Sequence, residues 1–380
     1  MHRKWILALF AVFFLQAAAA AGLAPLPELS SAAYLAYDAD FRYVIAQKNA
    51  NQRRSIASMT KVMTLLYTIE LVEKSQLSLE DTVIASSRAA GREGTQIKLK
   101  RGDRFSLEEL LYATALVSAN DAAVAIAEHI AGSEANFTRL MNQRALELGL
   151  KDTYYADCTG LLSIFSNNYS TAYDQAKLFQ LALEHALFRQ IISTPEYYLA
   201  AQDRKIVNSH PLLEMEGVEG GKTGATTPAG HTLITSRMYR GRRLITVILG
   251  ARTRDVRNQE SEQLLEWACT NLRVVIPQDE PITSVLVPDG VEHEIDAVLG
   301  RDFSVFAAAA SDLDFKSEIE LSTTIRAPID RGDKVGELVL RRQGQEFTRL
   351  DLVAGQSTGL ASWLRRIFNG LFRLIGGLGR

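Results

Sequence analysis

Ser58-Met59-Thr60-Lys61 opens a stretch whose apolar residues recur at the spacing of a buried helix: Met59, Val62, Met63 and Leu66. We therefore predict a helix that begins near Ser58, with its first turn at a surface. Positions i and i+3 of a helix lie on one face, so the amine of Lys61 is placed to reach the hydroxyl of Ser58. The pair predicts a nucleophile beside its own base.

Two further short motifs follow in order, Ser118-Ala119-Asn120 and Lys222-Thr223-Gly224, the last of which we expect to open a strand. A serine hydroxyl must lose its proton during attack. Burial and a neighbouring cation lower the pKa of a lysine, so that its neutral amine takes up that proton. We predict Ser58 as the acyl-forming nucleophile, Lys61 as the base and Ser118 as a proton relay to the departing amine.

The remaining motif residues suit substrate binding. Asn120 is expected to position Lys61 and a substrate amide. Lys222 is expected to be the cation beside Lys61 and, with Thr223, to bind a substrate carboxylate, while Gly224 permits close approach to the strand. Backbone N–H groups of Ser58 and of a residue just past Gly224 are expected to hold the developing oxyanion. A second cation is expected at Arg252 or Arg257.

Composition narrows the class of protein. The 380 residues are 47% hydrophobic and 23% charged, which is typical of a globular chain with room for two domains. A net charge of −2 offers no case for nucleic acid as a partner. No motif predicts a metal or cofactor site. A disulfide between Cys158 and Cys269 is one alternative, and two reduced, packed cysteines are the favoured one.

The sequences of both termini are typical of segments that interact with a membrane. Residues 1–21 read as a signal peptide, with cationic Arg3 and Lys4, an apolar run and an alanine tract. A membrane-spanning anchor is the alternative, but the run is short for a bilayer. Residues 359–380 carry an apolar face opposite arginines, typical of an amphipathic helix on an anionic membrane surface. Docking of that helix on the protein's own core is the alternative.

Strand-like runs lie at both ends of residues 22–276, with helices between them. Residues 32–46 read as two strands around a turn, and residues 231–249 as a hairpin through Tyr239-Arg-Gly-Arg. Helices are expected over 107–130, interrupted at 118–121, over 133–149 and over 257–270. The economical fold is an α+β domain whose antiparallel sheet is covered by helices. Residues 277–358 read as a second, small all-β domain.

The chain resembles the D-alanyl-D-alanine carboxypeptidase family of low-molecular-mass penicillin-binding proteins. The matching segments are residues 56–64, 117–128, 169–174 and 221–224 with Ala229-Gly230. The resemblance implies a transpeptidase-like, serine β-lactamase-like fold and removal of the terminal D-alanine from peptidoglycan stem peptides through an acyl-enzyme on Ser58. It also implies acylation by β-lactams and a place on the periplasmic face of the cytoplasmic membrane.

The sequence departs from the family pattern in two stretches. Glu93-Gly-Thr-Gln replaces a stretch that is usually rich in Gly-Ser-Ser, and Cys158 stands where Pro or Ala commonly precedes Thr. Both are expected to border the cleft and to affect substrate preference and turnover. Two rival functions remain, a serine β-lactamase and a non-enzymatic sensor of wall peptides. We find no E-x-x-L-N segment between Asn120 and Lys222 for the former, and a pure binder needs no paired nucleophile and base.

Overall fold

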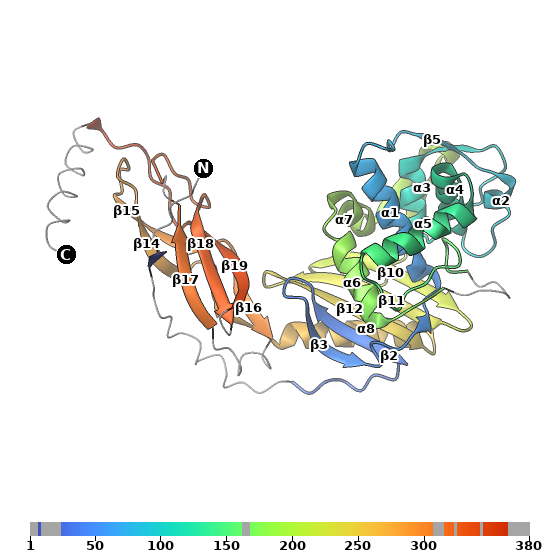
Figure 1. Ribbon diagram of the computed structural model, residues 1–380, viewed down its shortest axis with the longest axis horizontal. Coiled ribbons are helices and arrows are strands. Elements are labelled where there is room, and N and C mark those ends of the chain that lie inside the picture. Colours follow the sequence, from blue (N-terminus) through green and yellow to red (C-terminus); the bar gives the residue numbers. More distant parts are fainter. Residues whose placement is uncertain are drawn as a thin grey trace. The chain divides into compact units, whose positions relative to one another are not determined.

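The computed structural model describes residues 24–161, 168–306, 315–322, 325–342 and 345–363, together with the backbone of a two-residue strand, β1 (Leu7–Ala8). The described chain forms two compact units (Figure 1). One is Pro25–Thr270, and the other contains the described residues from Asn271 onward with Ala24 and β1. The rest of the expected signal peptide, and the expected terminal helix beyond Trp363, lie outside the described residues.

The first unit is built on a five-stranded antiparallel sheet that joins the two ends of the unit. Its strand order is β10 (Val218–Thr226), β11 (Gly230–Tyr239), β12 (Arg242–Ala251), β2 (Ala33–Asp38) and β3 (Tyr43–Lys48). In the pairing of β12 with β2, Thr246 lies opposite Ala36. The predicted sheet made from both chain ends is therefore confirmed.

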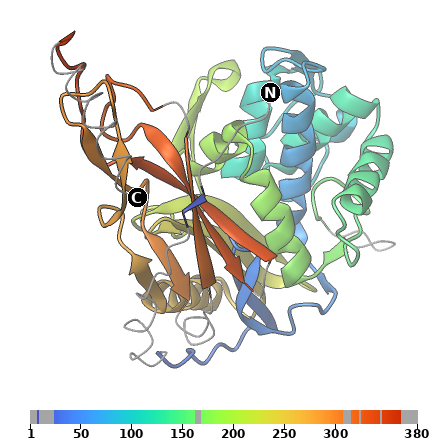
Figure 2. The same cartoon turned by 60° about the vertical axis from the view of Figure 1, so that its left-hand side comes forward.

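The sheet has a core on each face because neighbouring side chains of a strand point to opposite sides. Leu35 and Tyr37 of β2 belong to the larger core, which they share with the helices between the strands. Tyr34 and Ala36 belong to a smaller core beneath α8 (Arg254–Thr270). Figure 1 shows α8 on the other side of the sheet from α1 and α6, and in the turned view of Figure 2 it again lies apart from the blue-to-green helices.

The larger core is supplied by helices between β3 and β10. These are α1 (Lys61–Glu73), α2 (Ser87–Ala90), α3 (Leu107–Leu116), α4 (Asn120–Ala131), α5 (Glu134–Glu147), α6 (Ala172–Ala182) and α7 (Ala186–Ser193), with 3-10 turns η3 (Ala57–Thr60) and η4 (Ala200–Gln202). Short two-stranded pairs join them: β4 (Arg54–Ser55) with β7 (Tyr169–Ser170), β5 (Thr82–Ile84) with β6 (Arg104–Ser106), and β8 (Glu196–Leu199) with β9 (Arg204–Val207).

Helix α3 ends where the sequence predicts an interruption. It begins with a capping box between Ser106 and Glu109, which satisfies two N–H groups of its first turn. Ser118 then adopts a left-handed φ of 60°, which no helix continues through. Contrary to the prediction, Asn120 and Asp121 are not loop residues but form the first turn of α4. Ser118 and Asn120 therefore both come from one short segment between α3 and α4.

The predicted hairpin between β11 and β12 is confirmed, and its turn has a local cause. Arg240 and Gly241 both have positive φ values, 47° and 72°, as a type I′ turn requires. The strand that carries Lys222 differs from the prediction, because β10 begins at Val218 and Lys222 lies in its interior. The last four residues of β10, 223–226, pair with residues 230–233 of β11 in a regular antiparallel ladder.

The second unit is all β, as predicted for the chain after Pro277. Its six-stranded antiparallel sheet has the order β1, β17 (Phe315–Leu321), β18 (Lys334–Arg342), β19 (Gln345–Ala354), β15 (Glu294–Leu299) and β14 (Pro281–Leu286). A separate pair joins β13 (Leu272–Ile276) to β16 (Phe303–Phe306). No helix among the described residues is both long and apolar enough to span a bilayer.

Candidate active site

Ser58 and Lys61 meet at the start of α1. Ser58 lies in η3, directly after Ala57, whose φ of 48° is rare for a residue with a side chain and turns the chain into the helix. The Lys61 amine Nζ donates a hydrogen bond of 2.9 Å to Ser58 Oγ, and the whole Lys61 side chain is buried. The predicted pairing of hydroxyl and amine is therefore present in the fold.

A second hydrogen bond fixes the amine from behind. Lys61 Nζ donates to the backbone carbonyl of Thr159 at 2.9 Å, although the two residues are 98 positions apart. The turn that carries Thr159 packs directly on η3. A Cβ on Gly160 would overlap the Ala57 carbonyl and lie 2.8 Å from Thr60 Oγ1, so only glycine fits there. Thr159 therefore sets the direction of the amine.

The surroundings of Lys61 lower the pKa of its amine. The pKa of Lys61 is lowered to about 7: burial is the largest cause and the charge of Arg92 acts in the same direction, while Cys158, Asp157 and Asp121 raise it. We expected Lys222 to be the cation that depresses Lys61. Instead, the cation found to act on the pKa of Lys61 is Arg92. Lys61 in turn contributes, after burial and together with Arg257, to a pKa of Lys222 well below its usual value.

Ser118 and Asn120 lie at the corner between α3 and α4. The Ser118 hydroxyl is buried and has no hydrogen-bond partner among the described residues, and the same holds for the Asn120 side-chain oxygen. The Asn120 amide nitrogen donates to the Glu93 carbonyl at 2.8 Å. The two hydrogen bonds of the Lys61 amine go to Ser58 and Thr159, so the expected hold of Asn120 on Lys61 is not seen. An unpaired buried oxygen is nonetheless available to a substrate N–H.

Strand β10 carries the third motif along the edge of the sheet. Lys222 is buried, and its amine donates to the Thr223 carbonyl at 3.1 Å. A Cβ on Gly224 would lie 2.6 Å from Thr232 Oγ1 and 3.0 Å from Ser58 N. Gly224 therefore lets β10 pack closely against the segment that carries Ser58, a role different from the expected approach of substrate.

Of the two arginines considered as a second cation, Arg257 is the one that acts on the motif lysine. It is buried on α8, burial lowers its pKa to about 10, and its charge contributes to the lowered pKa of Lys222. Arg252 is exposed. Among the described residues no cluster of His, Cys, Asp or Glu is arranged to hold a metal ion. Cys158 and Cys269 are both free and buried, as favoured from the sequence.

Sequence reasoning missed the residues behind Lys61. The carbonyl of Thr159, the charge of Arg92 and the carboxylate of Asp157 all act on the amine, but none belongs to a motif. The departures from the family pattern at Glu93-Gly-Thr-Gln and at Cys158 were the available signal. Each adjoins one of these residues in sequence.

Family models match two segments of the chain. The family model described as D-alanyl-D-alanine carboxypeptidase matches residues 18–253, and the model described as penicillin-binding protein 5, C-terminal domain, matches residues 272–359. D-alanyl-D-alanine carboxypeptidase DacF of Bacillus subtilis is 34% identical over 333 residues, which cover 85% of each chain.

Solved structures are similar over the same regions. Penicillin-binding protein 5 from Haemophilus influenzae has a TM-score of 0.65 at 27% identity and covers 89% of this chain and 100% of its own. Penicillin-binding protein D2 from Listeria monocytogenes, in an ampicillin-bound form, has a TM-score of 0.57 at 28% identity and covers 64% of this chain and 99% of its own. From the matched family model, the ordered motifs and the paired Ser58 and Lys61, we conclude that the chain belongs to the D-alanyl-D-alanine carboxypeptidase family.

Proposed function

We propose that this chain is a serine-type D-Ala-D-Ala carboxypeptidase. It removes the terminal D-alanine from peptidoglycan pentapeptide stems through an acyl-enzyme on Ser58, and penicillins acylate the same serine. The observation that carries the proposal is the 2.9 Å hydrogen bond between a buried amine and a serine hydroxyl, in a chain of this family. A buried amine with a pKa of about 7 is neutral in a large fraction of molecules at neutral pH, and the neutral form is the one that a base needs.

The first half-reaction begins when Lys61 takes the proton of Ser58 Oγ. The oxygen attacks the carbonyl carbon of the penultimate D-alanine, and the carbonyl becomes an oxyanion. Backbone N–H groups of Ser58 and of Ala225, the residue just past Gly224, are proposed to hold that charge. The packing of Gly224 against Ser58 N supports this choice.

The second step releases the leaving group. Ser118 relays a proton to the amine nitrogen of the terminal D-alanine as the peptide bond breaks, and the stem peptide stays bound to Ser58 as an ester. The hydroxyl of Ser118 supports this role, because it is buried and no hydrogen-bond partner among the described residues competes for it. Water then hydrolyses the ester and restores the Ser58 hydroxyl.

Substrate binding is assigned to the two remaining motifs. Lys222 and Thr223 bind the terminal carboxylate of the substrate, and Asn120 binds an amide of the stem peptide. Support for the first comes from the buried amine of Lys222 and the nearby charge of Arg257, since a bound carboxylate would favour the protonated form of Lys222. The unpaired oxygen of Asn120 supports the second.

The location of the protein follows from its termini. We propose that residues 1–21 are removed on export and that the protein works at the periplasmic face of the cytoplasmic membrane. Residues 359–380 then attach it to the membrane surface as an amphipathic helix, with bulky apolar side chains such as Phe368 and Phe372 on one face.

The test compares the mature chain with Ser58→Ala. Each is incubated with a peptide that ends in D-Ala-D-Ala and, separately, with a labelled penicillin. We expect the wild-type chain to release D-alanine and to form a long-lived penicilloyl adduct. We expect the variant to release D-alanine at least about 10³-fold more slowly than wild type and to form no adduct. Equal thermal unfolding of the two proteins is the control that the serine, rather than the fold, was lost.

The rival functions predict other outcomes of the same test. Rapid turnover of penicillin, without a lasting adduct, would assign the chain to the serine β-lactamases. Binding of the peptide without release of D-alanine would make it a sensor of wall peptides.

A further inference from the structure

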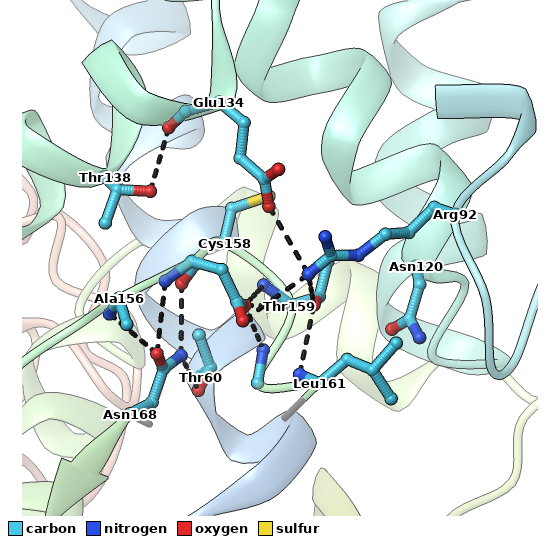
Figure 3. A network of polar contacts seen from close by, with 12 residues as sticks. Thr60, Arg92, Asn120, Glu134, Thr138, Ala156, Cys158, Thr159, Leu161 and Asn168 are labelled. Atoms are coloured by element: carbon cyan, nitrogen blue, oxygen red, sulfur yellow. Dashed lines mark hydrogen bonds and ion pairs between the residues drawn. The ribbon is translucent and has the colours of Figure 1, made fainter. Parts of the chain in front are cut away.

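Arg92 links the two stretches at which the sequence departs from the family pattern. It follows α2, next to Glu93, and it reaches the turn Asp157–Gly160, as Figure 3 shows. Among the described residues, one guanidinium nitrogen, Nη2, makes the polar contacts of the Arg92 side chain: a hydrogen bond of 2.9 Å to Thr159 Oγ1 and ion pairs of 3.4 Å to Asp157 Oδ2 and 3.5 Å to Glu134 Oε1. The Arg92 side chain is only 20% exposed, so water screens these contacts weakly.

The turn Asp157–Gly160 is also stabilised by hydrogen bonds among its own residues. Asp157 Oδ1 accepts hydrogen bonds from the N–H groups of Thr159 and Gly160, both at 2.6 Å, and from Thr159 Oγ1 at 3.0 Å. The turn is bound to α1 on its other side, since Thr64 Oγ1 donates to the Cys158 carbonyl at 2.8 Å. The Thr159 carbonyl, which accepts from the Lys61 amine, is therefore set by contacts on both sides.

Arg92 itself is held by the segment that carries it. The Asn120 amide donates to the Glu93 carbonyl, and Asn120 N donates to the Thr95 carbonyl at 2.7 Å. Asp121 accepts from the N–H groups of Ile97 and Leu99 at 3.1 and 3.0 Å. The motif on α4 thus fixes the segment from which Arg92 reaches the turn behind Lys61.

We infer that Arg92 is a positioning residue for the proposed base: by holding the Asp157–Gly160 turn through Thr159, it fixes the carbonyl that directs the Lys61 amine at Ser58. The inference rests on the proposed function of Ser58 and Lys61. Arg92 touches neither substrate nor reacting atom, and acts through Thr159.

The charges around Lys61 give this role a signature in the pH profile. The groups that act on the pKa of the amine are Asp157 and Cys158 on the turn, Asp121 on α4 and Arg92 after α2, with Glu134 of α5 paired to Arg92. Lys222 on β10 is a further buried amine, whose own pKa is lowered by burial and, after it, by the charge of Lys61. Loss of Arg92 removes a cation that lowers the pKa of Lys61 and frees Asp157, which raises it. Both changes increase the protonated fraction of Lys61 at neutral pH.

The experiment measures the acylation rate of full-length protein by a fluorescent penicillin between pH 5.5 and 9. We expect Arg92→Met to move the acidic limb of the profile to higher pH by about half to one unit and to slow acylation at pH 7 by about two- to fivefold. Arg92→Lys should recover much of the loss, because a single nitrogen makes all the contacts. Asp157→Asn keeps the Oδ1 acceptor and removes the negative charge, so it should move the limb to lower pH.

Arg88 is the matched control. It also pairs with Glu134, at 2.9 Å, but its side chain is 64% exposed and it makes no hydrogen bond to the turn. Arg88→Met should leave the profile at its wild-type position. A profile of Arg92→Met that coincides with that of wild type, or one that Arg88→Met reproduces, overturns the inference. If Arg92→Met fails to fold, Arg92→Lys and Asp157→Asn decide. Arg92→Lys should stay near the wild-type profile and Asp157→Asn should move the limb to lower pH, and a limb of Asp157→Asn that stays in place or moves to higher pH overturns the inference.

Failure of the proposed function looks different in this assay. In that case the wild-type protein itself forms no adduct at Ser58. The inference on Arg92 fails only when wild type is acylated and the profile of the Arg92 variants is unchanged.

Discussion

At the scale of single residues, burial gives Lys61 the lowered pKa that its proposed role as a base requires. Burial is the largest cause of the low pKa of Lys61. The buried amine donates hydrogen bonds to Ser58 Oγ and to the Thr159 carbonyl. A lysine in water is protonated at pH 7 and cannot take a proton from serine. The environment of Lys61, rather than the motif by itself, therefore lowers the pKa of the amine.

The pKa of Lys61 predicts how acylation depends on pH. The amine is a base only when it is neutral, and protonation increases as the pH falls through its pKa of about 7. We expect the acylation rate to be near its plateau at pH 8 and to fall about tenfold for each unit below pH 6. Stopped-flow acylation at constant ionic strength measures this. A rate that is flat from pH 5 to 8 would contradict a lysine base.

At the scale of elements, the site depends on how tightly three segments pack. Strand β10 and the turn Asp157–Gly160 both press on η3, and each does so at a glycine, Gly224 and Gly160. These close approaches bring Ser58, Lys61 and Lys222 together although the segments are far apart in the sequence. The strand and the turn are thus part of the catalytic geometry.

Gly160→Ala tests the contribution of this packing. Gly160 and Gly132 have similar left-handed φ values, 77° and 72°, but a Cβ on Gly160 would overlap the Ala57 carbonyl, whereas nothing lies within 4 Å of one on Gly132. We expect Gly132→Ala to cost about 1 kcal/mol of stability and to leave acylation intact. Gly160→Ala should cost about 2–4 kcal/mol and slow acylation at least tenfold. Denaturant unfolding and penicillin acylation measure both, and equal behaviour of the two variants would refute the role of the turn.

At the scale of the whole molecule, the chain consists of two units that the family models also match separately, at residues 18–253 and 272–359. The described part of the second unit ends with Leu360 paired to Gly290 and with Ala361 N donating to the Asp289 carbonyl. These contacts fall inside the proposed range 359–380, so the membrane helix is placed after Ala361 rather than from Gly359. Its removal should therefore leave both units folded.

Deletion of residues 363–380 tests the proposed anchor. We expect the truncated protein to keep its acylation rate within about twofold and to lose sedimentation with vesicles that contain anionic lipid. Phe368→Ser/Phe372→Ser, in the full-length protein, is the matched variant that separates apolar contact from charge, because it removes apolar bulk and leaves the arginines in place. Its binding should be much weakened. Undiminished sedimentation of the truncated protein would reject the anchor.

Much of this protein could be read from the sequence by itself. The order of its motifs, the pairing of Ser58 with Lys61, the hairpin through Arg240 and Gly241 and the β-rich second unit all follow from local periodicity and turn chemistry. These patterns link residues within a turn or a strand, and neighbours at that distance are set by backbone geometry. The fold class follows as well, because strands at both ends of a helical segment favour one sheet.

Only the tertiary structure decided what stands behind the base. Thr159 lies 98 residues from Lys61, and Arg92 reaches it from a third segment, so no periodicity connects them. The depth at which Lys61 is buried, and hence its pKa, depends on how η3, β10 and the turn Asp157–Gly160 pack together. Such contacts arise from the three-dimensional complementarity of distant segments, which a one-dimensional pattern does not record.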